Sequence, residues 1–175
     1  MKTFVMMFCV AIVVALGTEG SAKSPSDLSL HADCIYCGMH RDRFAHSRMV
    51  LHYKDGTSVG VCSIFCAARD YVKHVNEAPV LVEVGDYGTK QLTDAQEAWW
   101  VIGGSKTGVM TNRPKWAFQS RRDAQEFIAT YGGRLTDFDE AMKASYEDIY
   151  EDMRALKEMQ REYARSKLAA SSAAN

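Results

Sequence analysis

The sequence predicts an α+β protein with two similar small strand-strand-helix modules packed together, followed by a long C-terminal α-helix. Two patterns predict this class. Each half of the chain after residue 33 has short runs of β-forming residues followed by an amphipathic segment, and residues 138–168 contain neither Gly nor Pro. The chain has 175 residues, of which 47% are hydrophobic and 25% charged. It is therefore long and apolar enough to fold around a core.

Residues 1–22 have the layout of a secretory signal peptide. Lys2 precedes an uncharged run from Phe4 to Leu16, and Gly20-Ser21-Ala22 supplies the small residues of a cleavage site. An uncleaved anchor is the alternative, but the run is shorter than the ~20 residues that span a bilayer. We therefore expect cleavage after Ala22 and an extracytoplasmic protein, which in a Gram-negative bacterium means the periplasm. Residues 23–33 are expected to be a flexible lead-in.

Residues 34–85 are predicted to form the first α+β module. Asp55-Gly56 lies between two β-like runs, which is a typical hairpin signal. Ser63 suits the N-cap position of the helical segment that follows it. The predicted strand, strand, helix and strand are Met49–His52, Thr57–Val61, Ile64 to about Asn76, and Val80–Val84.

Residues 86–137 repeat this plan as a second module. Thr93-Asp94 is predicted to open a short helical segment, and Gly132-Gly133 is suited to end a later helix. Ser120 is the expected cap of that helix. The predicted strands and helix are Trp99–Ile102, Val109–Thr111 as the start of a returning strand, Lys115–Phe118, and Arg121–Tyr131.

Residues 138–168 are predicted to form one long helix, with a disordered tail over 169–175. Ile149, Met153, Leu156 and Tyr163 recur on it at about 3.5-residue spacing. One interpretation packs this narrow stripe on the body of the protein. The other pairs it with a partner helix or with a second copy of the chain.

The composition excludes several classes of function. A net charge of −1 leaves no broad basic field for nucleic-acid binding. The sequence has no G-x-S-x-G, no HExxH and no phosphate-binding glycine-rich loop, so we do not expect an enzyme.

Four cysteines form the most informative pattern. Cys34 and Cys37 make a C-x2-C, and Cys62 and Cys66 make a C-x3-C on the far side of the predicted hairpin. Two such pairs can bind structural zinc, because four thiolates close a tetrahedral sphere. A thiol-disulfide redox protein and inert structural disulfides are the alternatives. The redox interpretation is weakened because no convincing strand precedes Cys34, as it would in a thioredoxin-like motif.

The residues around Cys37 favour a soft metal. Cys37-Gly38-Met39-His40 offers a thiolate, a thioether and an imidazole within four positions, and sulfur ligands of this kind prefer Cu(I). Gly38 allows the tight turn that would direct Cys37 and Met39 at one ion. Met110 follows Gly108 in a turn-rich segment and is a further candidate, with packing in the core as the alternative for both methionines. His40 is a candidate fourth ligand, or else a solvated loop residue.

Several of these motifs resemble the NosL family. The resemblance is carried by Cys37-Gly38-Met39, the Asp-Gly hairpin and Asp94-Ala95. Further short motifs follow in the family's order and spacing: Val101-Ile102-Gly103, Gly108-Val109-Met110, and Ala117-Phe118 through Gly132-Gly133. NosL proteins are copper-binding accessory proteins of nitrous oxide reductase assembly. The resemblance covers about Ala32 to Phe138 and implies two related α+β modules with a Cu(I) site near their junction.

The resemblance also implies site residues and a partner. Cys37 and Met39 match the motif that supplies ligands, and Met110 matches the methionine of the second module. Copper would be delivered to a periplasmic maturation protein or to a membrane transporter complex that serves the copper centres of the reductase. A helix-mediated partner of residues 138–168 is a further expectation.

Three features depart from the family pattern. The sequence has no convincing lipid-attachment cysteine, and its long C-terminal helix extends past the family core. Cys34, Cys62 and Cys66 are additional to the single-cysteine version of the family, and could bind a second ion or replace the thioether site by a thiolate one. The sequence thus predicts a Cu(I) chaperone, with a zinc-stabilised four-cysteine interaction module or a thiol redox protein as alternatives.

Overall fold

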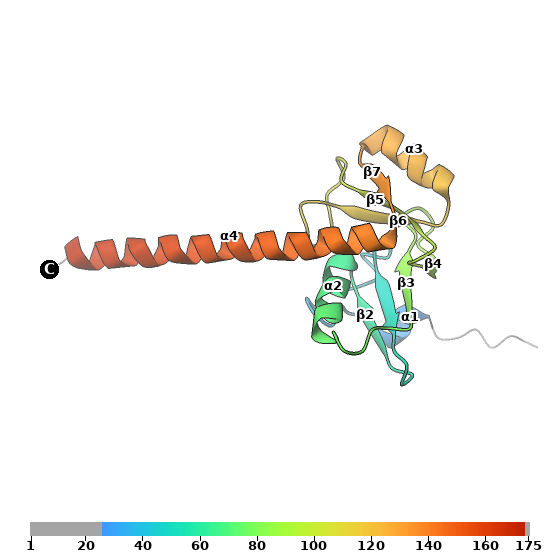
Figure 1. Cartoon of the computed structure of the whole chain (residues 1–175), viewed down its shortest axis with the longest axis horizontal. Helices are drawn as coiled ribbons and strands as arrows, with labels where there is room; N and C mark the ends of the chain where they lie inside the picture. Colours follow the sequence, from blue (N-terminus) through green and yellow to red (C-terminus); the bar gives the residue numbers. More distant parts are fainter. Residues whose placement is uncertain (1–25, 174–175) are drawn as a thin grey trace, which may run out of the picture.

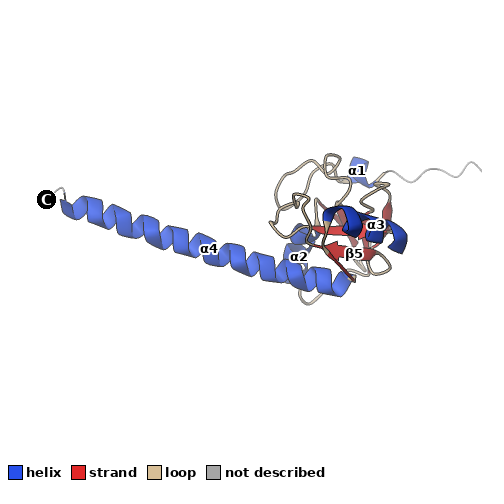
Figure 2. Cartoon of the chain, turned by 90° about the horizontal axis from the view of Figure 1, so that it is seen from above, coloured by secondary structure: helices blue, strands red, loops and turns tan. Residues whose placement is uncertain are grey.

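The computed structural model describes residues 26–173, which form two antiparallel sheets, three short helices and one long helix (Figures 1 and 2). The predicted α+β class is therefore confirmed. The predicted signal peptide over residues 1–22 lies outside the described residues. Within residues 26–173, no helix has both the length and the apolar character needed to cross a bilayer.

The first sheet has four strands in the order β2-β1-β3-β4. Its hairpin closes through Lys54-Asp55-Gly56, where Gly56 has a φ of +86° that a residue with a Cβ rarely adopts. After the hairpin comes a helix, and the next strand returns to pair with the first strand of the hairpin. In chain order the elements are β1 (Met49–His52), β2 (Ser58–Val61), α2 (Ile64–Lys73), β3 (Leu81–Gly85) and β4 (Leu92–Asp94).

The second sheet has three strands in the order β6-β5-β7. Its elements are β5 (Trp99–Ile102), β6 (Lys115–Phe118), α3 (Arg121–Tyr131) and β7 (Arg134–Thr136). As in the first sheet, a hairpin is followed by a helix and then by a strand that pairs with the first strand of the hairpin. Each unit is thus a strand-strand-helix-strand arrangement, which explains the repeated sequence pattern.

The long helix α4 (Phe138–Ala173) joins the two units and then leaves them. Its first turns bury Phe138, Ala141 and Met142 against α2 and β5. Every described side chain from Tyr150 to Ala170 is exposed, and Figure 1 shows this part of the helix extending as a rod far beyond the body. The helix reaches Ala173, past its predicted end at residue 168 and into the segment 169–175 that was expected to be a disordered tail.

The described part of the predicted lead-in over 23–33 is ordered. Asp27–Leu30 forms the short helix α1, whose Asp27 carboxylate accepts hydrogen bonds from Arg41 Nη2 at 2.9 Å and Arg48 Nε at 2.8 Å. Arg41 is fully buried, and it also donates to the main-chain carbonyls of His31, Val61 and Met49. These contacts fix α1 to the first sheet. The sequence alone did not indicate them, because the partners lie far apart along the chain.

Three further elements differ from the sequence predictions. Thr93-Asp94 ends β4 and does not open a helix, because this segment pairs with β3 and the Asp94 carboxylate then accepts from Gln96 N in a turn. Val109–Thr111 is not a strand, since Met110 has a φ of +63°, outside the β region. The three-residue strand β7 was not predicted, because so short a run carries no detectable periodicity.

Candidate metal centre

Cys34 and Cys37 lie on a tight main-chain loop. Asp33 and His40 form an isolated antiparallel bridge, Cys34 N donates to Met39 O at 2.9 Å, and Gly38 N donates to Cys34 O at 2.9 Å. Gly38 has a φ of +71°, as its role in the predicted turn requires. The loop, residues 32–41, is called the knuckle below.

Cys62 and Cys66 are held by the hairpin and the helix that follows it. Cys62 comes directly after β2, and Cys66 lies in the first turn of α2, where its main-chain N–H donates to Ser63 O at 3.1 Å. Ser63 occupies the predicted N-cap position with extended dihedral angles, although its side chain makes no capping hydrogen bond. The N-terminus of a helix carries a partial positive charge, which acts against the effect of burial on these two thiols.

The structure brings all four sulfurs together. The Sγ atoms of Cys34, Cys37, Cys62 and Cys66 lie within 4.8 Å of one another. Cys62 Sγ is 3.5 Å from Cys37 Sγ and 3.7 Å from Cys66 Sγ, and all four thiols are free. A tetrahedral ion with metal–sulfur bonds of about 2.3 Å needs sulfur separations of about 3.8 Å. The cluster is therefore already close to the geometry of a four-thiolate site.

Burial divides the four thiols into two kinds. Cys34, Cys62 and Cys66 are buried, and Cys37 is partly exposed. The three buried sulfurs would enclose an ion in the cluster. An incoming ligand would reach that ion from the side of Cys37. Cys37 is thus the side chain nearest to solvent and to an incoming ligand.

The thiols also change one another's acidity. Hydrogen bonds from Cys62 and Cys66 hold the pKa of Cys34 well below its usual range. The same interactions with Cys34, together with burial, raise the pKa of Cys62 and of Cys66. A thiolate is therefore favoured at Cys34, and a bound cation would favour deprotonation of Cys62 and Cys66.

A buried carboxylate fastens the knuckle to α2. The Tyr36 hydroxyl donates to Asp70 Oδ1 at 2.5 Å, and the Tyr53 hydroxyl donates to the other oxygen of Asp70. Asp70 is fully buried one turn after Cys66, and burial together with Asp70 raises the pKa of both tyrosines. The sequence analysis did not single out Tyr36, Tyr53 or Asp70. The one signal in the sequence was that Asp70, four positions after Cys66, shares a helical face with it.

The other predicted ligands have different environments. Met39 packs partly buried against the core, and its carbonyl accepts from Cys34 N inside the knuckle. Met110 is 36% exposed in the loop after β5, next to Thr111, whose hydroxyl donates to Asp148 Oδ2 on α4 at 2.6 Å. His40 lies outside the four-cysteine group. Its Nδ1 is 2.5 Å from Asp33 Oδ1, and its side chain is 62% exposed. The two thioethers and His40 stay predicted ligands.

Comparison with known proteins finds one matching family model and a similar solved structure. The family model NosL matches residues 25–146. Among solved structures, the crystal structure of the copper chaperone NosL from Shewanella denitrificans is similar, with 26% sequence identity and a TM-score of 0.50. The similarity covers 62% of this chain and 87% of that chain. A comparison with curated proteins found no match.

Proposed function

Because this chain belongs to the NosL family, we propose that it is an extracytoplasmic Cu(I)-binding chaperone that delivers copper to a maturation partner for nitrous oxide reductase. The resemblance predicted from the sequence motifs is confirmed by the family match over residues 25–146. The observation that carries the proposal is the cluster of four free thiols, whose sulfurs lie within 4.8 Å of one another.

Thiolate and thioether sulfurs are soft donors that suit Cu(I). A chaperone must hold the ion away from solvent and yet release it to its partner. The three buried thiols serve the first requirement, and the partly exposed Cys37 serves the second, because an incoming sulfur or imidazole can replace it first. Met39 and Met110 would complete or exchange ligands during this transfer.

The place of action and the partner are proposed from the sequence. The layout of residues 1–22 supports export to the periplasm. The receiving partner would be a periplasmic copper-site maturation protein or a membrane transporter complex. Such a partner needs sulfur or imidazole ligands that can reach the Cys37 side of the cluster.

Zinc binding is a second candidate function, and one observation favours it. The separations of 3.5 and 3.7 Å between cysteine sulfurs are near those of a tetrahedral four-thiolate zinc site. In that case the cluster would stabilise the first unit as an interaction module.

A competition titration separates the two candidates. Reduced protein is titrated with Cu(I) against a chromophoric chelator, with Zn(II) in parallel. We expect Cu(I) to bind far more tightly than Zn(II), and affinity to fall at acid pH because protons compete for the thiolates. One-to-one zinc binding that raises the melting temperature, without comparable Cu(I) affinity, would support the zinc module instead.

The thioether ligands are tested by Met39→Leu and Met110→Leu. Each variant is expected to weaken Cu(I) binding by roughly 3–30-fold and to leave Zn(II) binding unchanged, because leucine keeps the apolar volume and removes the soft donor. Met159→Leu on the exposed part of α4 is the matched control. Unchanged Cu(I) affinity in both variants would restrict the site to the cysteines.

A further inference from the structure

The outer half of α4 carries an apolar stripe that no described part of the chain covers. Met153, Leu156, Met159 and Tyr163 are 65%, 51%, 61% and 69% exposed, and with Gln160 they form what is called the outer stripe here. It continues from Ile149, which packs partly buried against the core. At the base of the stripe, a groove is lined by Phe65 and Arg69 of α2. The NosL match ends at residue 146, so the stripe is a feature of this chain beyond the matched family segment.

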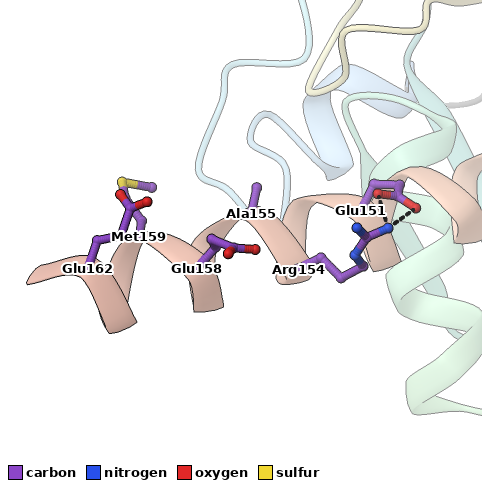
Figure 3. A pocket seen from close by; sticks show the side chains of 6 residues that line it. All are labelled: Glu151, Arg154, Ala155, Glu158, Met159 and Glu162. Carbon is purple, nitrogen blue, oxygen red and sulfur yellow. Dashed lines mark hydrogen bonds and ion pairs between the residues drawn. The ribbon is translucent and has the colours of Figure 1, made fainter. Parts of the chain in front are cut away.

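The opposite face of the same helix is polar and needs no cover. Arg154 Nη1 donates to both carboxylate oxygens of Glu151, at 3.1 and 3.0 Å, as the dashed lines in Figure 3 show. Glu158 and Arg165 continue this face. Helix α4 is thus amphipathic over a length where the side chains from Tyr150 to Ala170 are exposed. A large exposed apolar stripe bordered by charges marks an interaction surface.

Charge along the helix indicates what covers the stripe. By helical spacing, Asp152 lies on the face of the stripe near the body, and Lys167 lies on the same face near the tip of the helix. The neighbouring Glu147 and Asp148 already pair with Arg113 and Lys115. A second copy of the same helix, running in the opposite direction, would set Asp152 of each copy beside Lys167 of the other. We propose that the outer stripe is the interface of a homodimer in which two α4 helices pack antiparallel.

The two sheets and α2, called the body here, lie at the N-terminal end of α4. This position favours antiparallel over parallel packing of the two helices. Helix α2 packs on the first turns of α4 and reaches the groove at Ile149. In a parallel pair both bodies would lie at the same end and would hold the helices apart at the base of the stripe. In an antiparallel pair the bodies lie at opposite ends, and the tip of each helix extends toward the groove between α2 and α4 of the other copy.

The expected dimer is of modest strength. Five side chains from each copy would bury roughly 1,000 Å² in total, at the lower end of specific interfaces. The helices are already formed and anchored, so pairing does not have to meet the cost of helix nucleation. A dissociation constant of roughly 1–100 µM is expected.

Sedimentation of the reduced full chain over a range of about 1–500 µM tests the interface. Leu156→Gln and Tyr163→Gln should each raise the dimer dissociation constant by about tenfold or more, because each places an amide in the centre of the contact. Glu158→Gln is the matched control on the polar face and should change it less than about twofold. Tyr163 lies beyond the body, so its variant reports on the interface without disturbing the fold.

A charge exchange tests the direction of packing. Asp152→Lys or Lys167→Asp alone should weaken the dimer, and the double variant should restore it, because residue 152 of one copy meets residue 167 of the other. In a parallel pair these positions would be about 22 Å apart and the double variant would restore nothing.

The proposal is overturned if the chain is monomeric at every concentration, or if it dimerises and the stripe variants dimerise equally well. Binding of the outer stripe to lipid vesicles by the monomer, with no dimer, would overturn it too. The Cu(I) titration of the same variants keeps this result separate from the proposed function, since none of them changes a candidate copper ligand.

Discussion

Replacing both Cys62 and Cys66 by serine is expected to lower the Cu(I) affinity by about 100-fold or more, equivalent to about 2.8 kcal/mol or more of binding free energy. The two thiols are fully buried, and Cys62 lies 3.5 Å from Cys37 Sγ and 3.7 Å from Cys66 Sγ. A serine hydroxyl is a hard donor that binds Cu(I) poorly. The double variant leaves only two thiols of the cluster, those of Cys34 and Cys37.

The measurement is the chelator competition titration of reduced protein. Ser47→Ala is the matched control, because the Ser47 hydroxyl donates to Cys62 O at 2.9 Å and is close to the cluster without offering sulfur. The control should retain the wild-type Cu(I) affinity within about threefold. If the double variant binds Cu(I) as tightly as the wild type, the ion is held by Cys37, Met39 and Met110, and the four-thiol site is not the copper site.

Replacing Arg41 by methionine should destabilise the fold by about 3–5 kcal/mol. The guanidinium is fully buried, pairs with Asp27, and donates to the carbonyls of His31, Val61 and Met49. Methionine keeps much of the volume but leaves these buried acceptors without a donor, and each such acceptor is costly. Thermal unfolding should show a melting temperature lower by roughly 10 °C.

Arg43→Met is the control for this prediction, because Arg43 lies two positions away and is exposed. It should change stability by less than about 0.5 kcal/mol. A loss below about 1 kcal/mol in the Arg41 variant would mean that water or Arg48 replaces the lost hydrogen bonds.

The same network predicts a dependence of stability on pH. Burial alone would raise the pKa of Asp27, but hydrogen bonds from Arg48 and the charges of Arg48 and Arg41 outweigh it and hold the pKa below its ordinary value. A carboxyl with a depressed folded-state pKa stabilises the fold above its unfolded pKa of about 3.9. That stabilisation is lost as the pH falls toward the folded pKa. The acid limb of the stability profile should therefore be shallower in the Arg41 variant.

The local elements were predictable because their signals are local. The Asp55-Gly56 hairpin, the helix after Ser63 and the Gly-free long helix each follow from residues that adjoin one another, and the structure has all three. The two-pair spacing of the cysteines likewise predicts a cluster, and the four sulfurs do lie together.

What could not be predicted depends on contacts between distant residues. Asp27 lies 14 positions from Arg41 and 21 from Arg48, so nothing near Asp27 shows that α1 is ordered. The pairing of β4 with β3 overrides the helix signal of Thr93-Asp94. Tyr36 and Asp70 lie 34 positions apart, and only the folded chain brings this support for the knuckle together.

The four cysteines all fall within residues 34–66, which form the knuckle, the first hairpin and the first turn of α2. The second unit and α4 supply no thiol. Because the four cysteines are close in sequence, bringing their thiols together closes only short loops. The cost in chain entropy is therefore low. The site can therefore assemble early in folding, before the long-range packing of α4 on α2, and an ion captured at that stage would act as a nucleus for the rest of the chain.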